Sequence, residues 1–192
     1  MGGISINKFN SIKTNRLFIR TLGMQDRDDF FRYRSMPEIF KYQSWQPKDI
    51  GEIEEFIKEN IEICPNTSNT WMQLAICLED GQLIGDMGIH FMEDDYQVEI
   101  GYTLSTEFQG NGYAREAVSA IIDYLFYELK KHRITASVDP DNTKSIKLLE
   151  KVGFRKEAHF IKSFRMNNQW YDDCVYAVLA DEWNSPVTKN MV

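Results

Sequence analysis

The stretch FQGNGYAREA, residues 108–117, places two glycines one residue apart at the start of a predicted helix. It follows VEIGYTL, residues 98–104, an apolar run that is typical of a strand. The first backbone N–H groups of a helix lack intrahelical partners, and the helix dipole adds about half a positive charge there. Because glycine has no Cβ, a bulky anion can approach such a turn closely. The strand, glycine-rich turn and helix therefore predict an anion site, for which a pyrophosphate is the natural ligand.

Two other kinds of phosphate loop fit this stretch poorly. A Walker loop requires a lysine directly after its last glycine, whereas Tyr113 follows Gly112 in this chain. A dinucleotide-binding loop requires a third glycine where this chain has Arg115, and it opens its fold, whereas this stretch lies in mid-chain. On the glycines alone, an ordinary turn remains the simpler interpretation.

The rest of the chain predicts a single domain built from strands and helices. Alternating or short apolar runs between turn signals indicate strands at residues 16–22, 71–78, 82–91, 97–104, 134–139, 157–166 and 169–180. Apolar residues spaced three and four apart indicate helices at residues 26–35, 47–63, 112–131 and 142–154. We therefore expect an α/β (α+β) fold with one mixed, mostly antiparallel sheet over residues 15–183, a flexible segment at 1–14 and a polar tail at 184–192.

The composition narrows the possible partners and the location of the protein. The chain has 192 residues, 43% of them hydrophobic, and a net charge of −7, which argues against a nucleic-acid groove and suits a cationic partner. No apolar run reaches the roughly 18 residues of a membrane span, and the N-terminus lacks the apolar core of a signal peptide. The cysteines, Cys64, Cys77 and Cys174, fit neither a disulfide framework nor a metal site. We therefore expect a cytoplasmic protein that binds no membrane, nucleic acid or metal.

Two motifs at the right separation carry a family resemblance. QGNGYA, residues 109–114, matches Gln/Arg-x-x-Gly-x-Gly/Ala, and DPDNTKSIKLLEKVGF, residues 139–154, carries Asn142, Ser145 and Gly153 at the spacing expected after the next strand. Together they resemble the GNAT superfamily of acyl-coenzyme A-dependent N-acetyltransferases. TNRLFIRTL (14–22), EIGYTL (99–104) and RITASVDPDNTKS (133–145) look like its RimJ/RimL-type branch. The resemblance implies a GNAT fold with six to seven strands, a splayed central strand pair and about four flanking helices.

The resemblance also implies which residues bind the cofactor, acetyl-coenzyme A. Its pantetheine arm would pair with free backbone groups of the strand before the loop, at Tyr102, Thr103 and Leu104. The pyrophosphate would be held by Arg115 and by backbone N–H groups of Gln109, Gly110, Asn111, Gly112, Tyr113 and Ala114. Asn142 would bond the pantetheine. Lys144 and Lys147 would meet the 3′-phosphate, or else are solvated surface lysines.

The implied reaction is direct attack of a primary amine on the acetyl thioester in a ternary complex. Many family members have a tyrosine seven residues after the asparagine, to donate to the departing thiolate, but this chain has Leu149 there. Ser145 is then the candidate donor, unless it is a first-turn helix serine that bonds the backbone. Glu99 is a candidate base, although strand alternation puts it on the face opposite Tyr102 unless a bulge intervenes. His90 is a second candidate, and a water chain would need no dedicated base.

The acceptor is less narrowly implied than the donor. The aromatic residues Tyr33, Tyr42, Trp45 and Trp71, together with His90, are candidates for the acceptor channel, although core packing explains at least half of the aromatic set. The branch resemblance points to a protein N-terminal amine. The alternatives are a small amine of the aminoglycoside or polyamine type, or a coenzyme A-binding module without turnover. A homodimer is possible.

Overall fold

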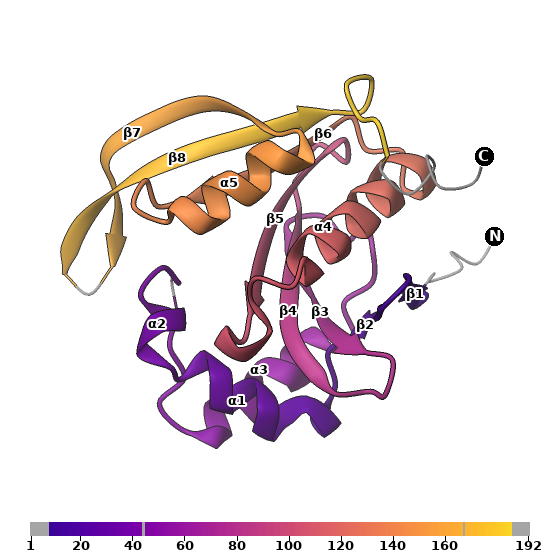
Figure 1. The fold of residues 1–192 in the computed structure, drawn as a ribbon, viewed down its shortest axis with the longest axis vertical. Coiled ribbons are helices and arrows are strands. Elements are labelled where there is room, and N and C mark those ends of the chain that lie inside the picture. The colour runs from indigo at the N-terminus through magenta and orange to yellow at the C-terminus, as the bar shows by residue number, and fades with distance from the viewer. Residues whose placement is uncertain (1–7, 44, 167, 186–192) are drawn as a thin grey trace.

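An eight-stranded sheet, with strand order β1-β2-β3-β4-β5-β6-β8-β7, carries helices on both faces (Figure 1). The computed structural model describes residues 8–43, 45–166 and 168–185. The strands are β1 (Ile12–Lys13), β2 (Leu17–Thr21), β3 (Thr70–Leu78), β4 (Leu83–Phe91), β5 (Gln97–Leu104), β6 (Arg133–Val138), β7 (Arg155–Met166) and β8 (Gln169–Leu179). Neighbouring strands are antiparallel except for β5 and β6, which are parallel. The predicted mixed, mostly antiparallel sheet is confirmed.

Five α-helices accompany the sheet within the described residues. They are α1 (Arg27–Arg34), α2 (Pro37–Phe40), α3 (Ile50–Asn60), α4 (Tyr113–Asp123) and α5 (Thr143–Val152). Two 3-10 turns, η1 (Met24–Asp26) and η2 (Thr106–Phe108), precede α1 and α4, and a π-helical turn, η3 (Tyr124–Glu128), extends α4. Among the described residues, no helix is long and apolar enough to cross a membrane.

The structure contains one strand and one helix beyond those predicted. β1 has two residues and α2 a single turn, and segments this short carry no recognisable period. β1 lies within the segment 1–14 that was predicted to be flexible, whereas residues 1–7 and 186–192 lie outside the described residues. The domain bounds 15–183 and the polar tail stay predictions.

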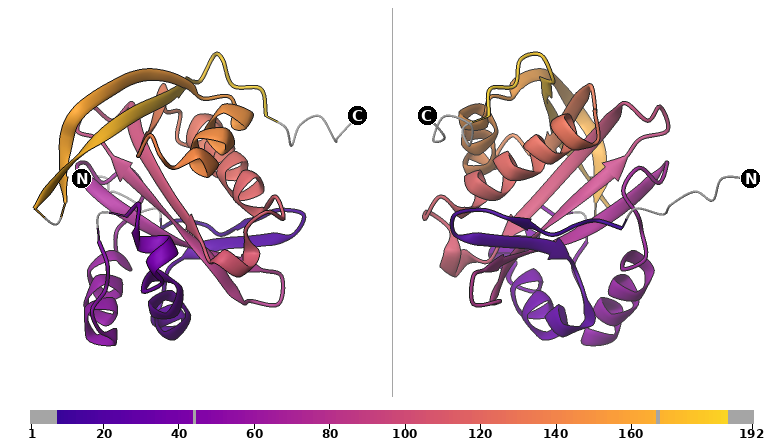
Figure 2. Two further views of the ribbon diagram at one scale, coloured as in Figure 1. Left: turned by 60° about the vertical axis from the view of Figure 1, so that its left-hand side comes forward. Right: turned by 90° about the vertical axis from the view of Figure 1, so that its right-hand side faces the viewer.

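The sheet separates two layers of helices. Figure 2 shows α4 and α5 on one side of the sheet and α1, α2 and α3 on the other. Alternation along β3 supplies both cores: Leu74 packs in the core that contains residues of α4, and its neighbour Ala75 packs with Phe30 and Ile53 of α1 and α3. The central strands are therefore buried on both faces, and neither face can carry a solvated site without an opening in the sheet.

Local hydrogen bonds and one glycine fix the ends of α3 and α5. Asp49 begins α3, since its Oδ1 accepts the Glu52 N–H at 3.1 Å. Asn142 caps α5, since its Oδ1 accepts the Ser145 N–H at 3.2 Å. Gly153 ends α5 with a φ of +113°, in the left-handed region that glycine adopts most easily.

The central strand pair opens partway along its length. β4 and β5 stay in register from Phe91 and Val98 to Gly85 and Leu104 with no shift, so this pair contains no bulge. β5 and β6, in contrast, pair only from Gln97 to Glu99, and beyond that point β6 continues on β8 alone. The predicted splay is therefore confirmed. It leaves Ile100–Leu104 without a strand partner on the β6 side.

Candidate active site

A cavity of about 550 Å³ lies at the gap between β5 and β6. Strands β3 to β6 contribute Trp71, Gln73, Gly88, Glu99, Ile100, Gly101, Tyr102, Ala136, Ser137 and Val138 to its lining. Residues from the segment around α1 to α3, from α5 and its preceding turn, and from the β7–β8 hairpin complete it: Arg34, Lys41, Tyr42, Gln43, Trp45, Phe56, Asp139, Asn142, Ser145, Leu149, Phe164, Met166, Tyr171, Asp172 and Asp173.

This cavity joins the two faces of the sheet. Glu99 and Gly101 sit opposite His90 and Gly88 of β4, on the face toward α1 and α3. Tyr102 points the other way and reaches Ser145 of α5. The alternation is as the sequence predicts, but it does not exclude Glu99 from the site, because the gap lets side chains of both faces line one cavity.

The loop before α4 has the backbone geometry that its glycines predict. Gly110 and Gly112 have φ values of +83° and +81°, in the left-handed region where a Cβ costs roughly 1–2 kcal/mol. A Cβ at Gly110 would meet nothing within 4 Å, so the conformation, not crowding by the protein, requires glycine there. At Gly112 a Cβ would also lie 3.4 Å from the guanidinium of Arg16.

The start of α4 offers hydrogen-bond donors that the protein itself does not use. Gly112 caps the helix without a side-chain hydrogen bond, so the N–H groups of Tyr113, Ala114 and Arg115 have no partner among the described residues. The N–H groups of Gly110, Asn111 and Gly112 are likewise unpaired there. Such a cluster of free donors at a helix N-terminus fits the pyrophosphate of coenzyme A.

Gln109 differs from its predicted role. Its N–H donates to the Thr106 carbonyl at 3.3 Å, so this amide is already engaged. Its side chain instead braces the site: Nε2 donates to the Leu104 carbonyl at 3.1 Å, and Oε1 accepts from Lys144 Nζ at 3.2 Å. The Leu104 carbonyl is therefore also in use. Thr103 pairs with Asp86 in the β4–β5 ladder, so Tyr102 is the residue of this set whose backbone groups face the gap without such a competitor.

On α5, the predicted residues meet the loop to different extents. Lys144 reaches Gln109, whereas Lys147 is exposed and makes no polar contact with any residue that the structure describes. Asn142 uses Oδ1 to cap α5, and its Nδ2 has no partner within the described chain. That amide group lines the cavity and is free to donate to a ligand.

Ser145 shares a hydrogen bond with Tyr102. Their hydroxyl oxygens lie 2.8 Å apart, so Ser145 Oγ bonds a side chain and not the helix backbone. Burial raises the pKa of Tyr102 to about 12, although the hydrogen bond with Ser145 opposes this shift. Sequence reasoning used only the backbone of Tyr102. The alternation of β5 could have revealed its side chain, because it points to the face on which the Ser145 helix packs.

Glu99, on the other face, also has an altered pKa. Burial raises its pKa, and the charge of Asp173 adds to this, while His90 and the Ser137 backbone N–H oppose it. His90 lies opposite Glu99 in the register of β4 and β5, and its ring stacks on Trp71 with the ring centres 4.9 Å apart. It is not among the cavity's lining residues.

The acceptor candidates divide into lining residues and one buried residue. Tyr42, Trp45 and Trp71 line the cavity, and Trp45 stacks on Phe56 at 5.0 Å. Tyr33 does not line it, contrary to expectation, because its ring is 1% exposed and packs in the core beneath α1.

Instead, Tyr33 belongs to a buried polar network that sequence reasoning missed. Asp86 of β4 is 0% exposed and accepts from Tyr33 Oη at 2.6 Å and from Gln73 Nε2 at 2.5 Å. Arg34 also donates to it through Nε at 3.1 Å and through Nη2. The signal in the sequence was a lone carboxylate within the apolar strand LIGDMGI, because a buried charge requires partners.

Comparison with known proteins agrees with this geometry. Residues 16–155 match the family model of the acetyltransferase (GNAT) domain. The chain belongs to the GNAT acetyltransferase family. It is therefore an acetyltransferase enzyme that uses acetyl-coenzyme A and transfers acetyl to amines, which sets aside the alternative of a coenzyme A-binding module without turnover.

Individual relatives cover almost the whole chain. An uncharacterized N-acetyltransferase of Bacillus subtilis, YnaD, is 31% identical over 90% of this chain and 99% of its own length. A crystal structure of a GNAT-family acetyltransferase from Bacillus anthracis is 30% identical, with a TM-score of 0.82 over 90% of this chain and 100% of the other. A spermidine N(1)-acetyltransferase of Vibrio cholerae is 27% identical over 82% of this chain and 90% of its own.

Proposed function

We propose that this enzyme acetylates a cationic primary amine by direct attack in a ternary complex, and that the amine is the N-terminus of a protein. The observation that carries the proposal is the opening through the sheet. The expected cofactor residues lie at the loop, α4 and α5, whereas the aromatic acceptor candidates lie on the side of α1 to α3. The cofactor and the acceptor amine would enter from opposite faces of the sheet and meet at the gap. The acetyl group can then pass directly between them, so no covalent enzyme intermediate is needed.

Glu99 is the proposed general base. The acceptor ammonium must lose a proton before it attacks, and a carboxylate with a raised pKa is a stronger base than an ordinary glutamate. Because Glu99 lines the cavity on the acceptor face, it can take that proton at a carboxylate oxygen directly or through one water.

The Ser145 and Tyr102 pair is the proposed donor on the cofactor face. Bound acetyl-coenzyme A supplies the acetyl thioester, and the thiolate that leaves must receive a hydrogen bond or a proton. Ser145 Oγ can donate while it accepts from Tyr102, so the phenol polarises the weaker hydroxyl acid. Leu149, where many family members have tyrosine, is 1% exposed and can only pack.

Gln73 is the proposed contact for the acceptor nitrogen. Its Nε2 donates to Asp86, a carboxylate that can only accept, so its Oε1 must be the atom left for other partners. Within the described residues that oxygen has no hydrogen-bond partner, and Gln73 lines the cavity. An amide oxygen held in this way suits an amine N–H.

The lining also supports a positively charged acceptor. Four carboxylates line the cavity, from Glu99, Asp139, Asp172 and Asp173, against two cations, Lys41 and Arg34, of which Arg34 is already paired with Asp86. The resemblance of residues 14–22 and 133–145 to the RimJ/RimL-type branch supports a protein N-terminus as the source of that amine. The carboxylates equally favour a second candidate, a polyamine, and the similarity to a spermidine acetyltransferase points the same way.

An acceptor panel tests the proposal. Thiol release from acetyl-coenzyme A would be followed with short peptides that carry free N-termini, the same peptides with acetylated N-termini, spermidine and an aminoglycoside. We expect turnover with free peptide N-termini, especially when basic residues follow, and none with the blocked peptides. Faster turnover of spermidine than of every peptide would transfer the assignment to the polyamine candidate.

A further inference from the structure

We propose that the segment between β1 and β2 holds the loop before α4 in its binding conformation, with Arg16 and Glu116 as positioning residues. We call Thr14, Arg16 and Glu116 the Arg16 clamp. The inference rests on the proposal that this loop binds the cofactor pyrophosphate, and it adds residues from outside both family motifs.

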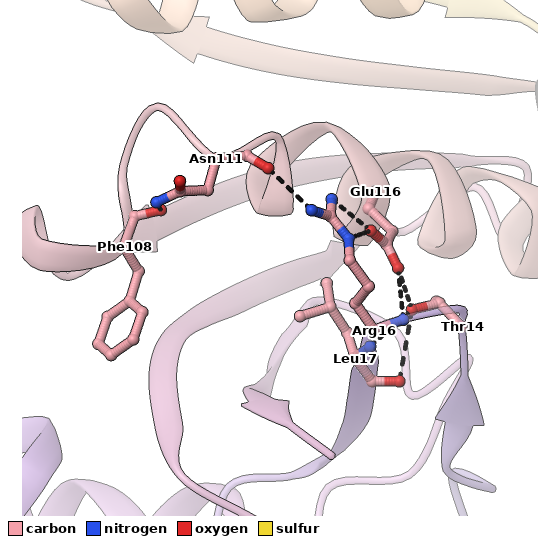
Figure 3. A network of polar contacts seen from close by, with 6 residues as sticks. All are labelled: Thr14, Arg16, Leu17, Phe108, Asn111 and Glu116. Atoms are coloured by element: carbon pink, nitrogen blue, oxygen red, sulfur yellow. Dashed lines mark hydrogen bonds and ion pairs between the residues drawn. The ribbon is translucent and has the colours of Figure 1, made fainter. Parts of the chain in front are cut away.

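The clamp is centred on the Glu116 carboxylate in the first turn of α4 (Figure 3). Its Oε1 accepts from Thr14 Oγ1 at 2.7 Å and from the Arg16 N–H at 2.9 Å. Its Oε2 lies 2.7 Å from Arg16 Nε and 2.6 Å from Nη2. This two-pronged pairing fixes the plane of the guanidinium as well as its position.

The same guanidinium reaches the loop. Arg16 Nη1 donates to the Asn111 carbonyl at 3.0 Å (Figure 3). The guanidinium carbon lies 4.5 Å from the centre of the Tyr113 ring. In a trans peptide the carbonyl and the following N–H point in opposite directions. By holding the Asn111 carbonyl, Arg16 therefore turns the Gly112 N–H away from itself, into the set of unpaired donors.

A second brace comes from within the loop. Asn111 Nδ2 donates to the carbonyls of Phe108 and Gln109, at 3.4 and 3.3 Å. Both bonds are long, and each is weaker than the charged contact from Arg16. The Gln109 side chain holds the start of the loop through Leu104 and Lys144, so the contact from Arg16 is what fixes the Asn111 carbonyl between the two glycines.

The clamp strengthens cofactor binding by ordering the loop, and not by attracting the phosphates through its charge. Glycine loses more conformational freedom on becoming ordered than any other residue, and Gly110 and Gly112 flank the Asn111 carbonyl. If the loop is ordered before the cofactor arrives, binding does not bear that entropy loss. Burial alone would raise the pKa of Glu116, but hydrogen bonds from Thr14 and Arg16 lower it overall, so the carboxylate neutralises the guanidinium.

Binding and relaxation measurements on variants test the clamp. We would measure coenzyme A affinity by calorimetry, and backbone 15N order parameters of residues 109–113 in cofactor-free protein, for Arg16→Ala, Arg16→Lys and Glu116→Gln. We expect Arg16→Ala and Glu116→Gln to weaken coenzyme A binding about tenfold and to lower the order parameters of the loop. Both variants should leave kcat and acceptor KM within twofold. Arg16→Lys should recover little, because a lysine ammonium cannot bridge Glu116 and Asn111 together.

The matched control is Arg27→Ala. Arg27 bridges Glu54 of α3 at 2.7 Å with similar exposure, but it touches no part of the loop. We expect wild-type coenzyme A affinity from this variant. If Arg16→Ala folds poorly, Thr14→Val removes the Thr14 bond to Glu116, together with the bonds between Thr14 Oγ1 and Leu17, and should shift both readouts in the same direction by a smaller amount.

Two results would overturn the inference. One is a set of unchanged loop order parameters in Arg16→Ala, which would mean that the loop is ordered without the clamp. The other is a weaker salt dependence of coenzyme A binding in that variant, which would make Arg16 a direct phosphate ligand. Failure of the wild-type protein to bind coenzyme A would instead refute the loop's proposed ligand, and the comparison of order parameters would still decide the clamp.

Discussion

Replacing Asp86 by asparagine should be costly for stability and specific in its effect on function. The Asp86 carboxylate is fully buried and receives hydrogen bonds from Tyr33, Gln73 and Arg34. The side chain of Arg34 is only 11% exposed, so water cannot take over the role of its partner. Asparagine keeps the size and one acceptor oxygen but leaves the Arg34 charge uncompensated.

The expected magnitude follows from that uncompensated charge. Removing one partner of a buried ion pair lowers the free energy of unfolding by about 3–5 kcal/mol. Because asparagine retains one acceptor oxygen, we expect a loss at the lower end of this range, about 3 kcal/mol. For a chain of this length, each kcal/mol lowers the melting temperature by roughly 2–4 °C, so we expect a fall of roughly 6–12 °C. Gln73 also loses the carboxylate that orients its amide, so acceptor KM should rise while coenzyme A affinity stays unchanged.

Thermal unfolding by circular dichroism, together with separate KM values for the two substrates, checks this expectation. The matched control is Asp26→Asn, which breaks the buried Arg20–Asp26 pair away from the cavity and should lower stability without affecting acceptor KM. The double variant Asp86→Asn with Arg34→Gln should recover part of the loss, because it removes the orphaned charge. A loss below about 1 kcal/mol, or simple additivity in the double variant, would refute the electrostatic reasoning.

Two further predictions concern the reaction itself. Because burial raises the pKa of Glu99, kcat/KM should rise with pH through a value above that of an ordinary glutamate, and Glu99→Gln should abolish this limb; an unchanged pH profile would remove Glu99 as the base. In the wild type, ionising Glu99 should also cost stability as the pH rises from the ordinary glutamate pKa through the raised one, and urea titrations should find this loss absent in Glu99→Gln. Ser145→Ala and Tyr102→Phe should each lower kcat by about tenfold to a hundredfold with little change in coenzyme A affinity. Since the two hydroxyls share one hydrogen bond, the double variant should be little worse than either single one, and normal turnover in Ser145→Ala would exclude this pair from the mechanism.

The parts of the site that sequence reasoning identified depend on neighbours along the chain. The glycine-rich turn and the Gly153 helix end each follow from chemistry within a few residues. Alternation along β5 likewise assigned Glu99 and Tyr102 to opposite faces correctly. Local rules suffice for such features because the interacting groups are held together by the covalent chain itself.

Tertiary packing decided which of these features meet. Only the divergence of β5 from β6 brings Glu99 and Tyr102 to one cavity, and no local pattern encodes where two strands part. Gln109, assigned to phosphate binding by its place in the motif, proved to brace Leu104 and Lys144 instead. Asp86 bonds Arg34, which is 52 residues away in the sequence, and Arg16 bonds Asn111, which is 95 residues away. The sequence by itself determined the family, the acetyl donor and the glycine-rich loop before α4. Only the tertiary structure decided the partners of Asp86 and Arg16, because contacts between residues so far apart in the chain form only once the layers have packed.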